Sequence, residues 1–250
     1  MFGKFKQTDA LRQWRSAAQT AGTVALEDLR RKAAQARQLK THLDRLLFVS
    51  ASRLALPAIG NQAFPKPHDA DWFWRPELWC GPLGTPGLAA VANKHKLGQE
   101  VTLFHDCAIS ELTLRQLRNT READLAAYGV LMDVFRFDGT YLSLAIDLPS
   151  SAAQGLKRTH LIRVETILEM ETPLEIFARL NIQHGPNTEQ LVRELPLDQE
   201  DIRVEFDLSY TQMQESRVEK LWLDLIFESP EMNQVILRDV TFSRRPRAAM

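Results

Sequence analysis

The sequence predicts a mainly β protein, an antiparallel β-sandwich of the jelly-roll kind with an N-terminal α-helical arm. From about residue 101 onward, apolar and polar residues alternate with a period of two in short segments bounded by Gly, Pro, Asn or Asp. Residues 8–48 instead carry apolar residues at three- and four-residue steps, which is typical of an amphipathic helix. The strands follow one another too closely for alternating β-α units, so we expect paired antiparallel sheets.

The composition fits one large domain with an appendage. Of the 250 residues, 44% are hydrophobic and 25% are charged, which is enough for a sizeable core. The net charge of −1 hides an asymmetry. Residues 1–46 carry ten Lys/Arg and four Asp/Glu, a balance of +6, and the other 204 residues have a balance of −7. A basic arm on an acidic body favours self-association or contact of the arm with an anionic surface.

The N-terminus gives no targeting signal. Charged residues interrupt MFGKFKQTDALRQWRSAAQT every few positions, so we expect no signal peptide. No stretch approaches the roughly 18 apolar residues of a membrane span. We therefore expect a cytoplasmic protein with Cys80 and Cys107 as thiols. Release by phage-like lysis would also need no signal peptide and stays open.

Residues 1–49 form the predicted arm. Thr8 suits a helix N-cap, and Gly22-Thr23 suits a break between two helices because Gly weakens a helix and Thr can cap the next. The apolar stripe consists of Leu26, Leu29, Ala33, Ala36, Leu39, Leu43 and Leu46. Three interpretations stay open: helices laid against the body of the protein, self-association through residues 8–48, and binding to a membrane or nucleic acid.

Two loops precede the strands. Residues 50–70, SASRLALPAIGNQAFPKPHDA, hold three prolines and a glycine and are predicted to be a linker to a β-sandwich domain at 71–250. The second loop, GPLGTPGLAA at 81–90, lacks the Gly-Lys-Ser/Thr ending of a phosphate-binding loop.

Ten segments are predicted to be strands. They are VTLFHD, ELTLRQLR, GVLMDVFRF, YLSLAIDL, THLIRVETILEM, PLEIFARLNI, QLVREL, IRVEFDLSY, KLWLDLIFE and QVILRDVTF. Asp138-Gly139 predicts a tight hairpin between the third and fourth, while ELTLRQLRN also fits a helical period.

The alternation within the strands predicts which face is buried. In PLEIFARLNI one face is apolar from Leu174 to Ile182 while Arg179 and Asn181 point the other way, and in IRVEFDLSY the apolar face runs from Val204 to Tyr210.

An aromatic cluster precedes the strands. The segment ADWFWRPELWCGP brings Trp72, Phe73, Trp74 and Trp79 close together. Each such side chain has about 150–250 Å² to bury, and exposing all four would forfeit much hydrophobic stabilisation. Three interpretations follow: a plug that closes the core, a platform on which a sugar or base stacks, or a surface for self-association. As a platform, its ligand-binding residues would be Trp72, Trp74, Trp79, Arg75 and Asp71.

Other polar residues suggest weaker candidates. Cys80, His95, His105 and Cys107 are the ligand types that zinc favours, but their spacing fits no common zinc motif. Calcium would need oxygen ligands such as Asp106, Asp138 and Asp239, and paired acid/base chemistry would need carboxylates such as Glu165, Glu169 and Glu171. None of these patterns is a catalytic or metal motif, so we expect no metal and no cofactor.

The basic tail, Arg244-Arg245-Pro246-Arg247, is either a solvated terminus or a binding segment for phosphate or an anionic polymer. Because no aromatic base-stacking residues accompany it, nucleic-acid recognition is not favoured.

Two resemblances add to these predictions. Residues 221–247, LWLDLIFESPEMNQVILRDVTFSRRPR, resemble the closing strands of galactose-binding-like, carbohydrate-binding jelly rolls. The segments ADWFWRPELWCGP, LFHDC and LRDVTFSRRPR together resemble an uncharacterised family of alphaproteobacterial proteins that spans nearly the whole chain. The first resemblance implies a glycan ligand, and the second implies no function.

The sequence therefore favours a non-enzymatic binding module, with carbohydrate as the ligand class. Two alternatives remain: a structural subunit, such as a spike or base protein of a phage-like or gene-transfer particle assembled through the N-terminal helix, and a glycan-active enzyme.

Overall fold

The computed structural model describes residues 3–55, 59–60, 63–198 and 200–247. The chain divides into two compact units, Met1–Arg53 and Leu54–Met250. None of the described helices is both long enough and apolar enough to cross a bilayer.

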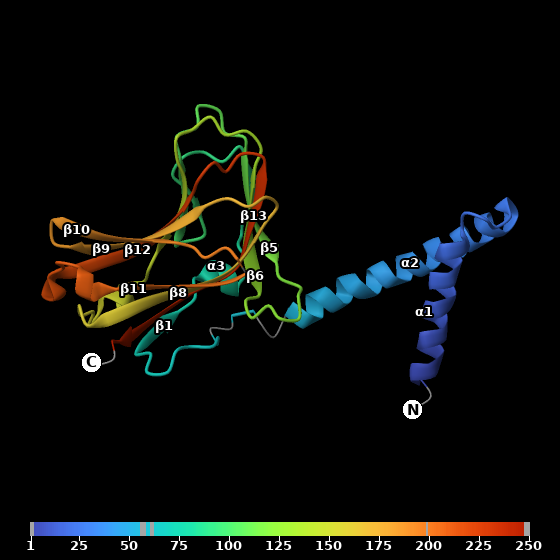
Figure 1. Cartoon of the computed structure of the whole chain (residues 1–250), viewed down its shortest axis with the longest axis horizontal. Helices are drawn as coiled ribbons and strands as arrows, with labels where there is room; N and C mark the ends of the chain where they lie inside the picture. The colour runs from blue at the N-terminus through green and yellow to red at the C-terminus, as the bar shows by residue number, and fades with distance from the viewer. Residues whose placement is uncertain (1–2, 56–58, 61–62, 199, 248–250) are drawn as a thin grey trace. The chain divides into compact units, whose positions relative to one another are not determined.

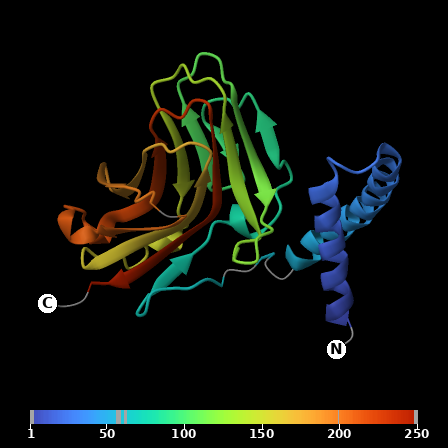
Figure 2. The ribbon, with the colours of Figure 1, turned by 45° about the vertical axis from the view of Figure 1, so that its right-hand side comes forward.

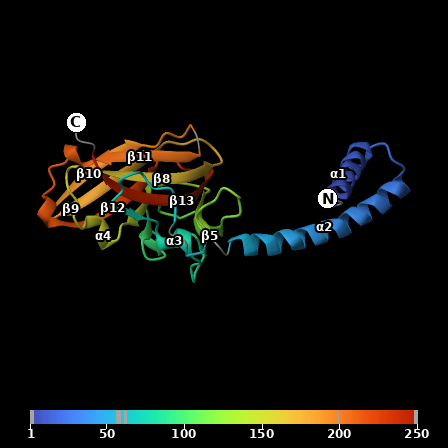
Figure 3. The ribbon, with the colours of Figure 1, turned by 90° about the horizontal axis from the view of Figure 1, so that it is seen from below.

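The first unit is helical. Helix α1 spans Gly3–Thr20 and helix α2 spans Leu26–Ala55, with the turn around Gly22 between them (Figure 3). The predicted break is therefore present. Thr8 lies inside α1 instead of capping it, and Thr23 donates its hydroxyl to the carbonyl of Thr20 instead of capping α2. Helix α2 continues past residue 49, and part of the predicted linker at 50–70 lies outside the described residues.

The second unit is a sandwich of two sheets whose described strands all pair antiparallel (Figures 1 and 2). In the described residues, the seven-stranded sheet has the order β11-β8-β13-β6-β5-β2, and β1 also pairs with β13. The six-stranded sheet has the order β10-β9-β12-β7-β4-β3.

The bounds in the seven-stranded sheet are β1 Trp72–Trp74, β2 Gly87–Ala89, β5 Leu112–Arg118, β6 Tyr128–Val134, β8 His160–Met170, β11 Asp201–Asp207 and β13 Asn233–Pro246. The bounds in the six-stranded sheet are β3 His95–Leu97, β4 Val101–His105, β7 Leu142–Asp147, β9 Ile176–His184, β10 Asn187–Glu194 and β12 Val218–Phe227. Two short helices, α3 Glu77–Cys80 and α4 Ser150–Ala153, and two 3-10 turns, η2 Leu208–Tyr210 and η3 Glu215–Arg217, lie in the connections.

The predicted fold class is confirmed, because each of the ten predicted segments overlaps one of the strands β4 to β13. ELTLRQLRN forms β5 and is not a helix. Strands β1, β2 and β3 were not predicted, since three residues are too few to establish a period of two.

The predicted hairpin at Asp138-Gly139 is wrong. Strand β6 lies in the seven-stranded sheet and β7 in the six-stranded sheet, so this connection crosses from one sheet to the other. Asp106, after β4, fixes the crossing: its carboxylate accepts hydrogen bonds from the Thr140 amide at 2.6 Å, the Thr140 hydroxyl at 2.6 Å and the Tyr141 amide at 3.2 Å. Asp138 and Gly139 therefore lie where the chain passes from one sheet to the other, and not in a hairpin within one sheet.

The core fills the space between the two sheets. Ile176, Ala178, Leu180 and Ile182 of β9 are fully buried, as the alternation predicts. In the β11 segment Val204, Phe206 and Leu208 are buried, as the alternation predicts. The strand ends before η2, and Tyr210 at the end of η2 is 72% exposed.

Candidate functional site

Two side chains of the segment ADWFWRPELWCGP that were predicted to contact a ligand lie in the interior. Trp79 on α3 has no exposed surface, and its Nε1 donates to the carbonyl oxygen of Leu237 at 3.1 Å. Arg75 is also fully buried and donates through Nε and Nη2 to the two carboxylate oxygens of Asp239, at 2.9 and 2.8 Å. Trp79 and Arg75 therefore lie in the interior, as the plug interpretation predicts, and neither side chain presents a surface to a ligand in this structure.

The rest of the cluster lies along the pairing of β1 with β13. Trp72 is half-buried and donates from Nε1 to the Ser151 hydroxyl at 3.1 Å, while the Trp74 ring packs 5.6 Å from the ring of Phe242. Asp71 accepts hydrogen bonds from Arg244 at 2.9 and 3.3 Å. The structure brings the five predicted residues to one region, where each of them makes a contact that holds β1 or α3 onto the sandwich.

The potential metal ligands are engaged separately. His105 contacts the Val91 carbonyl at 2.9 Å through Nε2, and its Nδ1 accepts from the Cys107 amide at 3.2 Å. Burial raises the pKa of the Cys80 thiol to about 11, which keeps it protonated. In the part of the chain that the structure describes, no three His, Cys, Asp or Glu side chains group together as metal ligands.

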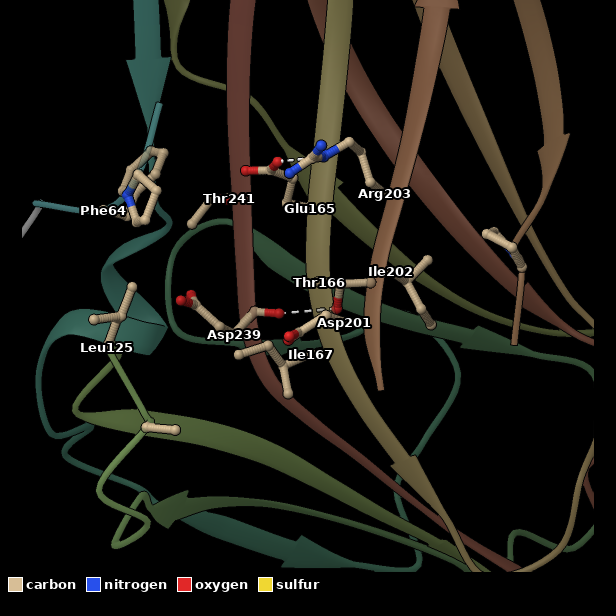
Figure 4. A pocket seen from close by; sticks show the side chains of 13 residues that line it. Phe64, Leu125, Glu165, Thr166, Ile167, Asp201, Ile202, Arg203, Asp239 and Thr241 are labelled. Atoms are coloured by element: carbon tan, nitrogen blue, oxygen red, sulfur yellow. Dashed lines mark hydrogen bonds and ion pairs between the residues drawn. The ribbon is translucent and has the colours of Figure 1, made fainter. Parts of the chain in front are cut away.

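Of the candidate carboxylates, Glu165 and Glu169 are held in ion pairs, and Glu171 is exposed. Glu165 pairs with Arg203 at 2.7 Å, and Glu169 pairs with Arg238 and Arg121. Glu165 and Asp239 line a cavity of about 540 Å³ on the outer face of the seven-stranded sheet, beside Phe64 and Thr241 (Figure 4). Glu165 and Asp239 are thus paired to arginines, and a third carboxylate, Asp201, also lines the cavity.

The basic tail is part of the fold. Arg244 bonds Asp71 and the carbonyls of Ala152 and Gln154. Arg245 bonds Glu205, and Arg247 lies 3.3 Å from Asp207. The charges of the three arginines are thus paired with carboxylates of the same chain, which argues against binding of phosphate by this tail.

A groove that the sequence did not predict lies on the outer face of the six-stranded sheet. We call it the Trp222 groove, and its volume is about 720 Å³. The outward side chains of five adjacent strands, with those of two flanking loops, line it. They are Lys94, Lys96, Thr102, Phe104, Tyr141, Ser143, Ala145, Asp147, Arg179, Gln183, Lys220, Trp222 and Asp224.

The register of the strands explains the shape of this groove. Thr102, Ala145 and Asp224 are direct cross-strand partners on β4, β7 and β12, and their row places two small side chains at the centre of the face. Trp222 lies two residues from Asp224 along β12, on one side of this row. Phe104 lies two residues from Thr102 along β4, on the other side of the row. Small side chains at the centre of the face, between two aromatic side chains, leave room for the groove.

A buried polar network fixes one side of the groove. Arg179 donates to Asp224 Oδ2 through Nε at 3.0 Å and Nη2 at 2.8 Å. The Asn181 amide, which is fully buried, donates to the same oxygen at 3.0 Å and accepts from Gln190 at 3.0 Å. These bonds set the orientation of Asp224 and Arg179 before any ligand arrives.

Trp222 itself is half-buried, with polar neighbours in register on both sides. Asp147 on β7 and Asn181 on β9 are its cross-strand partners. The Lys220 amine lies 5.5 Å from the centre of the indole and 2.7 Å from Asp147. The signal in the sequence was available: in KLWLDLIFE, Trp222 shares its parity with Lys220 and Asp224, so a large aromatic side chain stands on the polar face of the strand.

Comparisons with known proteins give the following similarities. The family 11 carbohydrate-binding module from Clostridium thermocellum matches 66% of this chain and 100% of that chain, at 8% identity and a TM-score of 0.40. The C-terminal family 22 carbohydrate-binding module of Clostridium thermocellum Xyn10B matches 75% of this chain and 100% of that chain, at 9% identity and a TM-score of 0.39. The enzymatically active domain of tailspike protein 4 from Bacteriophage CBA120 matches 61% of this chain and 21% of that chain, at 7% identity and a TM-score of 0.40.

The structural neighbours thus include carbohydrate-binding modules. The comparison with curated proteins gave no match. A family model matches residues 1–250, and this chain therefore belongs to the family of unknown function DUF6478.

Proposed function

We propose that the protein is a carbohydrate-binding module whose ligand occupies the Trp222 groove. The observation that carries the proposal is the half-buried indole of Trp222 in a groove of about 720 Å³, among hydrogen-bonding side chains. A pyranose ring presents an apolar face of C–H groups and a rim of hydroxyls. An indole ring can stack on the C–H face, and neighbouring polar groups can hydrogen-bond to the hydroxyls.

The groove supports binding for a second reason, because its polar side chains are already oriented. Asp224, Arg179 and Asn181 hold one another through the bonds described above. A ligand that bonds to groups fixed in advance loses less free energy to ordering them. Gln183 and Ser143, on neighbouring strands, supply further donors and acceptors along the same face.

The same contacts favour binding over cleavage. Of the described residues lining the groove, two are carboxylates, and each is in an ion pair: Asp147 with Lys220 and Asp224 with Arg179. Glycoside hydrolysis needs one carboxyl group that stays protonated and a second that is free to act as base or nucleophile. Ion pairing opposes both roles, so we propose a module without hydrolytic activity.

The test is affinity electrophoresis of the intact chain through gels that contain single polysaccharides. Trp222→Ala is expected to abolish the retardation that a bound polysaccharide causes, because the stacking surface is lost. Phe135→Ala is the matched control, since Phe135 is 53% exposed and lies outside the groove. Retardation that survives Trp222→Ala, or that is lost equally in Phe135→Ala, would refute the Trp222 groove as the binding site.

A further inference from the structure

We infer that the Trp222 groove selects an anionic glycan, one whose sugars carry carboxylate or sulfate groups. This inference rests on the proposed glycan binding and adds the ligand class. The charged side chains that line the groove are the first observation that supports it. Four are basic (Lys94, Lys96, Arg179 and Lys220) and two are acidic (Asp147 and Asp224). The groove is therefore basic on a body whose overall balance is acidic.

The ion pairs decide where the excess charge lies. Lys220 is paired with Asp147 at 2.7 Å, and Arg179 is paired with Asp224 at 2.8 Å. Lys94 and Lys96 are both exposed, and within the described residues no hydrogen bond, ion pair or ring contact joins either amine. Two uncompensated ammonium groups thus lie at the β3 edge of the groove.

The backbone places these lysines on the groove side. Lys96 on β3 is the cross-strand partner of Thr102, whose side chain lies in the central row of the groove. Lys94 lies two residues earlier, where the chain turns into β3 through the bond from the His95 amide to the Ala92 carbonyl at 3.2 Å. Lys96 therefore extends the row that leads across the sheet to Asp224 and Arg179, and Lys94 lines the same edge of the groove two residues before it.

The conformation of Lys94 is a second, independent observation. Its φ is +62°, in the left-handed region that a residue with a Cβ rarely adopts. Glycine would occupy this position without strain. The turn is held in place by the Asn93 side chain, which accepts from the His105 amide at 3.3 Å. Asn93 thus anchors the turn that carries Lys94 at the rim of the groove.

Together these features describe how an acidic sugar would bind. One ring would stack on Trp222, and a carboxylate or sulfate group toward the β3 edge would meet Lys94 and Lys96. An ammonium group with no internal partner gains more from such an anion than a lysine already paired with aspartate, because no existing ion pair must be broken.

The test uses the intact chain and matched pairs of polymers. Polygalacturonate is compared with its methyl-esterified form, and dextran sulfate with dextran, beside an array of other neutral and acidic glycans. We expect binding to acidic glycans that weakens as the ionic strength rises, and weaker or no binding to the neutral counterparts. The two pairs separate carboxylate recognition from sulfate recognition.

The variants are Lys94→Gly and Lys96→Gln, with Lys157→Gln as control because Lys157 is exposed and does not line the groove. Lys94→Gly removes the charge and also relieves the positive φ, so the variant is expected to fold at least as stably. Each variant should weaken binding of the acidic glycan roughly threefold, and the double variant about tenfold. The control should bind as the wild type does.

The outcomes separate the two proposals. If neutral glycans bind as tightly as acidic ones, or if the lysine variants keep full affinity for the acidic glycan, the anionic preference is refuted and glycan binding stands. If the wild-type chain binds neither neutral nor acidic glycans, the proposed function fails, and this inference fails with it.

Discussion

Trp79 and Trp222 have the same side chain and opposite environments. Trp79 follows Pro76 on α3, a helix of a single turn that is buried against the sandwich, and its indole N–H bonds the Leu237 carbonyl. Trp222 lies at an outward position of β12, between two inward leucines. The position of each residue in its element, and not the residue type, determines which tryptophan is structural.

Substitution at these two positions should therefore have opposite effects. Trp79→Ala is expected to lower the free energy of unfolding by about 3–5 kcal/mol, since it opens a cavity in the core and leaves the Leu237 carbonyl without a donor. Trp222→Ala should cost less than about 1.5 kcal/mol, because its ring is partly in solvent. Urea denaturation followed by circular dichroism measures both. Equal destabilisation by the two variants would contradict the assigned roles.

Arg75 and Asp239 form a buried ion pair that locks the segment before α3 onto β13. Arg75→Met should destabilise the protein by about 3–5 kcal/mol, because it leaves the Asp239 carboxylate buried without its partner. The double variant Arg75→Met/Asp239→Leu should recover most of that loss, since no charge remains to be desolvated. Chemical denaturation of the two single variants and the double variant completes a thermodynamic cycle. A double variant less stable than Arg75→Met would contradict this expectation.

At the scale of elements, ion pairs join segments that are far apart in sequence. Glu169 on β8 contacts Arg238 on β13 and Arg121 in the loop between β5 and β6. The hydrogen bond from Arg238 lowers the pKa of Glu169 below its usual value of 4.5, with a further contribution from the charge of Arg121. The cluster thus links a loop to two neighbouring strands of the seven-stranded sheet.

This cluster predicts a pH dependence of stability. A carboxylate with a lowered pKa in the folded state contributes stability above its unfolded pKa and loses it as the pH falls through the folded value. Wild-type stability should therefore decrease from about pH 5 toward pH 3, and Glu169→Gln should reduce this slope. Thermal unfolding at a series of pH values measures it. Glu171→Gln, an exposed substitution just after β8, is the control and should keep the wild-type slope.

The long strands could be predicted from the sequence because side-chain alternation is a local property. In β9, Ile176, Ala178, Leu180 and Ile182 already show which face is buried. Sheet membership is not local: Asp138-Gly139 has the composition of a hairpin turn, yet it connects strands of different sheets. The Trp222 groove could not be predicted for the same reason, since the partners of Trp222 on β7 and β9 come from distant parts of the sequence.

At the scale of the whole molecule, the two compact units predict separable folding. A chain that lacks residues 1–53 should keep the sandwich, since the unit Leu54–Met250 contains both sheets and the core between them. Its near-ultraviolet circular dichroism and its glycan binding are expected to match those of the intact chain. Loss of cooperative unfolding in the shortened chain would show that the helical unit is required.

The helical unit carries a further prediction, which concerns assembly. Helix α2 leaves Leu26, Leu46 and Leu47 exposed by 71%, 61% and 65%, and residues 1–46 are basic. Exposed leucines on an amphipathic helix favour self-association. We expect light scattering to show an oligomer for the intact chain and a monomer for the chain without residues 1–53. A monomer in both cases would exclude assembly through this arm, and with it the particle-subunit alternative.

The sequence by itself determined the class of the fold, the broken N-terminal helix and the ten long strands, because each depends on the types and spacing of a few neighbouring residues. Only the tertiary structure decided that Trp79 and Arg75 are interior, that the basic tail is internally paired, and that a groove forms around Trp222. Each of these features depends on which strands are neighbours and on the register of their pairing. The packing of the whole sandwich determines both. For this protein the scaffold is encoded locally, and the candidate site arises from contacts between distant segments.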